Sequence, residues 1–126
     1  MIDSPPLPKG KYARTGYVSP IDAALEVIGG KYKVAILYHI RESALRFGEL
    51  HRLMPLATKR ILTKQLRELE RDGMINRKIF RQVPPRVDYS LTKAGKSIIP
   101  ILEDLCEWGK RRMRKQRKVS GSKMSP

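Results

Sequence analysis

The chain has 126 residues, of which 40% are hydrophobic, and this size and composition predict one folded domain with a modest core. Its 27 lysine and arginine residues against 12 acidic ones give a formal net charge of +15, which predicts a polyanionic partner such as nucleic acid, or else an acidic membrane surface. No apolar run reaches the ~20 residues of a membrane span, no secretory signal opens the chain, and the single cysteine, Cys106, excludes an intramolecular disulfide framework.

The first segment, residues 1–18, contains three prolines, two glycines and three cationic side chains with almost no apolar periodicity. This composition predicts a flexible N-terminal arm. Ser19 and Pro20 follow as an N-cap and a first helical residue. They predict a short helix that reaches Ile28 and ends at Gly29.

The middle of the chain predicts three more helices. The first runs from Lys31 to about Arg41, and its broad apolar surface indicates a central place in the core. A short helix follows and ends before Pro55. Thr58 then supplies the N-cap of a longer helix, which Asp72–Gly73 ends.

The C-terminal part predicts a β-hairpin and a last helix. Residues 75–81 and 86–91 alternate apolar and polar side chains, and two prolines stiffen the turn between them. The last helix is predicted to run from Thr92 to about Arg112, with a kink at Pro100, which lies too far in for its first turn. The remaining residues, 113–126, carry cations and no acid, which predicts a basic, disordered tail.

The helix after Thr58 has one cationic face and one apolar face. At about 100° per residue, four of its cations fall within roughly 60° of one another, and three leucines lie opposite them. Such a helix can bury its leucines while its cations meet the groove of double-stranded DNA. The alternative is a solvated face on which Arg67 and Arg71 pair with Glu70 and its neighbours. The predicted DNA contacts lie mainly in the first half of the helix: Thr58, Lys59, Arg60, Thr63 and Lys64, with Arg67 beyond them.

The hairpin is also basic. Its cations would meet backbone phosphates or enter the adjacent minor groove, and the residues beside the rigid turn suit the tip of a wing. Protection of a sheet edge by charge is the alternative. The predicted DNA contacts of the hairpin are Arg77, Lys78, Arg81 and Arg86.

Five ordered blocks of sequence resemble the HxlR family of bacterial winged-helix transcription regulators. They are SPIDAALEVIGGKYKVAIL (19–37), LRFGELHRLMP (45–55), LTKQLRELERDGMI (62–75), VPPRVDYSLTKAGKSIIPIL (83–102) and LCEWG (105–109). The resemblance implies a mainly α-helical fold with a small β-hairpin, which is the winged helix-turn-helix. It also implies a cytoplasmic, nucleoid-associated protein that binds pseudo-palindromic operators as a homodimer.

In that family the dimer forms largely through the helices nearest the two termini. The last helix of this chain agrees, because it has more apolar surface than one flank of a small domain readily covers. The residues expected at the dimer interface are Ile21, Leu25, Ile98, Ile101, Leu102, Leu105 and Trp108.

The chain departs from the family at its first helix. Many relatives carry a cysteine at the position of Ser19, and in some this thiol senses oxidants or electrophiles. A serine hydroxyl cannot form a disulfide, so thiol sensing there is not available to this chain. Cys106 is expected to act as a small buried hydrophobic residue, with redox sensing or an intermolecular disulfide as the alternative.

Catalysis and cofactor binding find no support in the sequence. His39, His51 and Cys106 do not match a familiar metal spacing, and no phosphate loop or nucleophile elbow occurs. We therefore predict a sequence-specific regulator that is no enzyme, with residues 19–112 as its DNA-binding and dimerisation domain. An unidentified small-molecule effector remains open as a further partner. The alternative function is a sequence-neutral architectural protein of the nucleoid, which would use the arm and tail to coat DNA.

Overall fold

The computed structural model describes residues 15–124, and side chains as far as residue 117. Most of the predicted arm, residues 1–18, therefore lies outside the described residues. The described elements are α1 (Pro20–Ile28), α2 (Lys33–His39), β1 (Leu45–Arg46), α3 (Phe47–Leu53), α4 (Lys59–Arg71), β2 (Ile75–Phe80), β3 (Arg86–Leu91), α5 (Lys93–Ser97) and α6 (Ile99–Met124). The prediction of a mainly helical fold with a small hairpin is confirmed.

Three of the described helices are preceded by an N-cap residue whose side-chain hydroxyl accepts a hydrogen bond from the first turn. The Ser19 hydroxyl accepts a hydrogen bond from the Asp22 backbone N–H at the start of α1. The Thr58 hydroxyl accepts from the Ile61 N–H at the start of α4, at 3.1 Å. The Thr92 hydroxyl accepts from the Gly95 N–H at the start of α5, at 3.0 Å. Because the first amides of a helix lack partners within it, these caps fix where each helix begins, as predicted. Gly73 follows α4 with a φ of +74°, a conformation that favours glycine.

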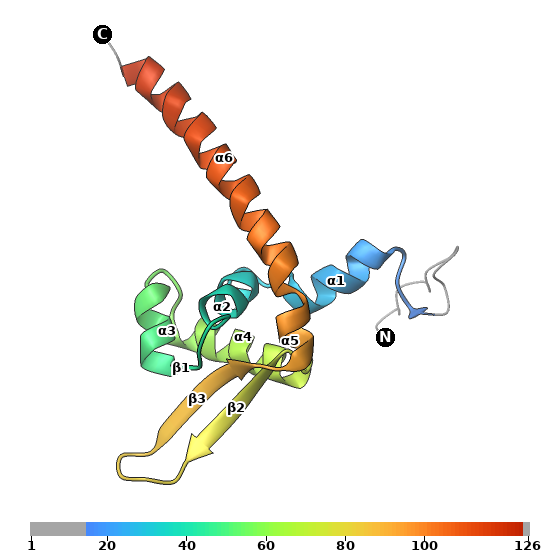
Figure 1. Ribbon diagram of the computed structural model, residues 1–126, viewed down its shortest axis with the longest axis vertical. Helices are drawn as coiled ribbons and strands as arrows, with labels where there is room; N and C mark the ends of the chain where they lie inside the picture. Colours follow the sequence, from blue (N-terminus) through green and yellow to red (C-terminus); the bar gives the residue numbers. More distant parts are fainter. Residues whose placement is uncertain (1–14, 125–126) are drawn as a thin grey trace, which may run out of the picture.

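The strands form one antiparallel sheet in the order β1-β3-β2. The hairpin of β2 and β3 has Ile75 opposite Leu91 at its base and Phe80 opposite Arg86 near its tip. The sequence prediction missed β1, which adds Leu45 opposite Tyr89 on the other side of β3. In Figure 1 the hairpin tip and the end of α6 lie at opposite ends of the long axis of the molecule.

The hydrophobic core lies between α2, α3, α4 and the base of the sheet. It includes the apolar face of α4, whose three leucines are at most 1% exposed. Because that face is buried, the opposite face of α4 points outward. The fully or almost fully buried side chains are Ile36, Leu37, Ile40, Leu50, Met54, Ala57, Leu62, Leu66, Leu69, Met74, Ile75, Leu91 and Leu102.

The predicted last helix is in fact two helices. The first, α5, ends at Ser97, and α6 begins at Ile99 after the C-cap residue Ile98. Pro100 therefore lies in the first turn of α6, where its missing N–H costs no helical hydrogen bond. The prediction of a kink inside one continuous helix is wrong for this reason.

The sequence also placed the helix end too early, at about Arg112. In the structure α6 continues to Met124, through part of the segment expected to be a disordered tail. No helix among the described residues is both long enough and apolar enough to span a bilayer.

Candidate nucleic-acid interface

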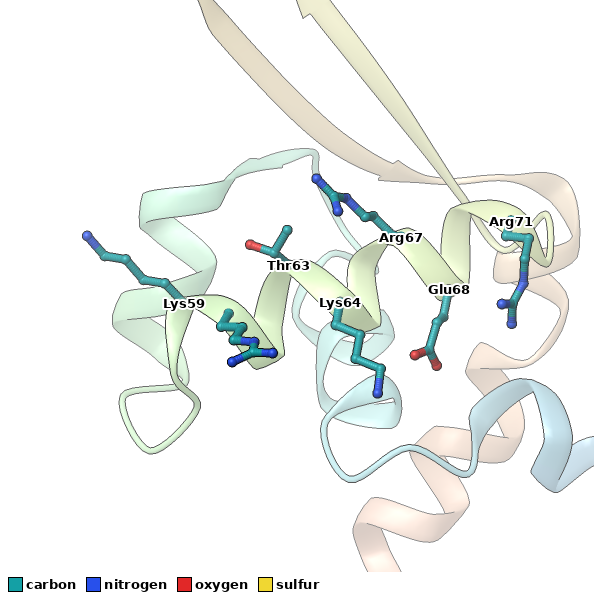
Figure 2. A pocket seen from close by; sticks show the side chains of 7 residues that line it. Lys59, Thr63, Lys64, Arg67, Glu68 and Arg71 are labelled. Atoms are coloured by element: carbon teal, nitrogen blue, oxygen red, sulfur yellow. The ribbon is translucent and has the colours of Figure 1, made fainter.

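The outward face of α4 is strongly basic. Lys59, Arg60, Lys64, Arg67 and Arg71 are all exposed, and the last four lie opposite the buried leucines. Together with Thr63 and Glu68 they line an open groove along the helix. In Figure 2, Lys59, Thr63 and Arg67 point toward the hairpin, and Lys64, Glu68 and Arg71 point the opposite way. The sequence prediction that these cations lie on the face away from the leucines is confirmed.

Arg71 differs from the other cations of this face. Its Nε atom donates to Asp72 Oδ1 at 3.3 Å, so it has a carboxylate neighbour at the end of the helix. This contact favours the structural interpretation for Arg71, in which the cation pairs with a local acid. The cations of the first half, Lys59 and Arg60, lie at the other end of α4.

A buried lysine links α2 to α4. Lys33 Nζ lies 2.6 Å from Glu68 Oε2, and the Lys33 side chain is only 5% exposed. One turn earlier on α4, the Gln65 side-chain oxygen accepts from the Tyr32 backbone N–H at 2.8 Å. The two links hold the start of α2 against α4. The sequence prediction missed this role because a lysine is almost always an exposed residue.

We expect the Lys33–Glu68 pair to stabilise the fold in a pH-dependent way. The hydrogen bond from Lys33 holds the pKa of Glu68 below its ordinary value. Such a carboxylate stabilises the fold above its unfolded-state pKa, and this contribution is lost as the pH falls through its folded-state pKa. The Glu68→Gln variant should therefore unfold at a lower urea concentration than wild type at pH 7, and the difference should be smaller at about pH 3, below the ordinary pKa of a glutamate.

Glu70→Gln is the matched control for this prediction, because Glu70 is exposed on the same helix. It should change the urea midpoint little at either pH. An equal loss for Glu68→Gln at both pH values would show that the carboxylate charge is not what matters.

In the hairpin, three of the four predicted contacts are exposed and one is engaged within the sheet. Arg77, Lys78 and Arg81 are exposed. Arg86 instead donates to both carboxylate oxygens of Asp88, at 2.9 and 2.8 Å, and lies over the Phe80 ring at 4.7 Å.

The Arg86–Asp88 pair is electrostatically strong. Its hydrogen bonds raise the pKa of Arg86 and lower that of Asp88, so both groups are charged. The pair joins two positions on one face of β3, and the contact of Arg86 with the Phe80 ring crosses to β2. Arg86 therefore has a structural role, whatever it contributes to DNA.

Helix α4 and the hairpin lie side by side along one groove. Thr63 and Arg67 of α4 line a second, narrower groove together with Arg77 of β2 and Tyr89 of β3. The two basic elements that the sequence analysis separated along the chain thus face one shared surface.

The residues expected at a dimer interface divide into two groups. Ile21 and Leu25 of α1 are 65% and 53% exposed, and Ile101, Leu105 and Trp108 of α6 are 63%, 49% and 58% exposed. Leu102, in contrast, is only 2% exposed and belongs to the core of its own chain, and Ile98 packs against that core. Leu102 is therefore removed from the expected interface, because a partner could not reach it.

The histidines and the cysteine are half-buried. His51 Nε2 hydrogen-bonds with the Ala57 carbonyl at 3.0 Å, and burial lowers the pKa of His39. Cys106 lies beside Tyr38, and a hydrogen bond between the two side chains raises the pKa of Tyr38. In the part of the chain that the structure describes, no three His, Cys, Asp or Glu side chains gather as metal ligands would.

A helix pair, a capped basic helix and a basic hairpin on one core define a winged helix-turn-helix protein. The HxlR-like helix-turn-helix family model matches residues 27–117, and the chain belongs to this family. It is thus a helix-turn-helix transcriptional regulator of the HxlR type and not an enzyme.

Relatives and solved structures agree with this assignment. An uncharacterized HTH-type transcriptional regulator of Methanothermobacter thermautotrophicus is 51% identical over 94 residues, which are 75% of this chain and 72% of that protein. The regulator YtcD of Bacillus subtilis is 53% identical over 93 residues, 74% of each chain. The structure of the redox regulator HypR in its oxidized form has a TM-score of 0.72 and 46% identity, and the match covers 74% of this chain and 96% of that one.

Proposed function

We propose that this chain is a sequence-specific regulator that binds a pseudo-palindromic operator as a homodimer. The observation that carries the proposal is the basic outer face of α4, which lies beside the basic hairpin over a shared groove. A helix of this kind fits the major groove of DNA. There arginine and lysine can hydrogen-bond to the edge of guanine, and threonine can contact base edges that offer either a donor or an acceptor. The hairpin cations Arg77, Lys78 and Arg81 would contact phosphates beside it.

The proposed dimer uses α1 and α6. Each of the two helices has more than one large apolar side chain that is about half exposed or more, which favours burial against a second copy. A two-fold dimer would present two recognition helices, and their half-sites would lie about one helical turn apart. In this proposal residues 19–112 form the binding and dimerisation unit.

Thiol sensing at the start of α1 is not part of this proposal. HypR is a redox regulator, but Ser19 in this chain is an N-cap whose hydroxyl donates to Asp22 Oδ2 at 2.9 Å. Any thiol response would have to use Cys106, the one cysteine in the chain. Non-reducing electrophoresis after mild oxidation tests whether Cys106 joins two copies.

The experiment that tests the proposed function measures DNA binding against salt. Fragments bound by the purified protein are selected from genomic DNA, and their affinity is compared with that of a random duplex of equal length. If each protomer neutralises about four to six phosphates, the logarithm of affinity should fall with the logarithm of salt at a slope of about −7 to −11 for the dimer. A strong preference for the selected fragment is also expected.

A sequence-neutral architectural protein is the second candidate. The exposed cations of α6 favour it, because this part of the helix has no acid: Lys110, Arg111, Arg112, Arg114, Lys115 and Arg117. The same experiment separates the two functions. Equal affinity for selected and random DNA would support coating of DNA and would contradict operator recognition.

A further inference from the structure

We propose that a groove between α3 and the hairpin binds a phosphate of the DNA backbone, as a third contact beside α4 and the wing. The groove is lined by Arg46, Gly48, Glu49, Arg52 and Arg86. The proposal rests on the proposed function and deepens it, because it names a phosphate-binding residue set outside the recognition helix and the hairpin cations expected from the sequence.

The fold brings two exposed arginines of this groove together. Arg46 is in β1, where it lies opposite Asp88 of β3 and so beside the outer half of the hairpin. Arg52 is one turn along α3 from Gly48, and its guanidinium folds back over that glycine: a Cβ built on Gly48 would lie 3.9 Å from Arg52 Nη2. Both guanidinium groups therefore lie at the end of α3 that faces the hairpin.

These two guanidiniums are available to a ligand. Arg86 is held by Asp88, but the ion pairs found among the described residues include neither Arg46 nor Arg52. Glu49 is the one acid in the lining, and its Oε1 accepts from the Arg46 backbone N–H at 2.9 Å. Its charge is thus turned partly toward the start of α3. Because Asp88 offsets Arg86, the remaining positive charge comes from Arg46 and Arg52, which outweigh Glu49.

A phosphodiester is the ligand that this chemistry fits. Arginine presents a planar fork of donors that matches phosphate oxygens, and two forks at one groove can share one phosphate or hold adjacent ones. Gly48 leaves the space between them without a side chain, so a backbone phosphate can come close. Strand β1 pairs with β3 at the side of the hairpin, so in the proposed complex a duplex lying along α4 and the hairpin would pass this groove.

The test compares Arg46→Ala/Arg52→Ala with wild type on the selected fragment and on random DNA. Loss of two phosphate contacts per protomer should make the salt slope of a dimer shallower by about 3 to 4 and weaken binding at least about tenfold near 0.1 M salt. Because phosphates carry no sequence, both DNAs should lose affinity by the same factor, and the preference for the selected fragment should persist.

Lys93→Ala/Lys96→Ala is the matched control, since it removes the same charge from exposed positions on α5. It should leave the slope near that of wild type, and thermal unfolding should show all variants folded. An unchanged slope for Arg46→Ala/Arg52→Ala, or an equal change in the control, overturns the proposed groove. Failure of the proposed function looks different, because wild type itself would then show no preference between the two DNAs.

Discussion

Replacing Arg60 and Lys64 together with alanine should abolish recognition of the operator while the protein stays folded. Both side chains are exposed on the outer face of α4, so their removal leaves the buried leucines in place. A good contact from a side chain to a base contributes about 1–3 kcal/mol, so four lost contacts in a dimer should weaken specific binding by about 1,000-fold or more. Fluorescence anisotropy with the selected fragment measures this loss.

The loss should be selective for sequence, which distinguishes it from a general loss of charge. Binding of the Arg60→Ala/Lys64→Ala variant to random DNA should weaken much less, so that its preference for the selected fragment disappears. The α6 variant Arg111→Ala/Arg114→Ala, with the same change of net charge, should keep that preference. A double α4 variant that still prefers the selected fragment would show that α4 does not read the sequence.

The largest expected effect on stability comes from Gly95→Ala. Gly95 is buried in α5, and a Cβ there would overlap the carbonyl oxygen of Met74 and lie 3.1 Å from Leu91 Cδ2. The same Met74 carbonyl accepts from the Thr92 N–H at 3.1 Å, so α5 is packed directly on the segment that joins α4 to β2. Relieving the overlap with Met74 would require the backbone to move, and we expect a loss of about 2–4 kcal/mol in the free energy of unfolding.

Gly109→Ala provides the control for Gly95→Ala in urea denaturation. Gly109 lies inside α6, and a Cβ there would meet no atom within 4 Å. Alanine is the better helix former, so this variant should gain about 0.5–1 kcal/mol. If both glycine variants behaved alike, the close approach of α5 to Met74 would not limit stability.

Helix α4 was predictable from the sequence because several independent signals coincide there. Thr58 supplies a cap, Gly73 ends the helix, and leucines and cations separate at helical spacing. The three leucines are buried and the cations exposed, as the period of 3.6 residues requires. The start of α1 was predictable for the same reason, since its cap and its proline are local signals.

Features that depend on contacts between distant segments could not be predicted. The strand β1 has only two residues, too few to show an alternating pattern, and it exists because β3 lies beside it. Lys33 is buried because Glu68, far along the chain, meets it. Leu102 shares the apolar stripe of α6 with exposed residues, and only the packed structure shows that its side faces the core.

The most direct test of the central claim is protection of guanine N7 atoms from methylation in the selected fragment. These atoms lie in the major groove, where α4 is proposed to bind. We expect two protected half-sites about one helical turn apart, and loss of that protection in the Arg60→Ala/Lys64→Ala variant. Full binding without protection of any major-groove guanine, at half-sites that contain guanine, would contradict recognition of DNA by α4.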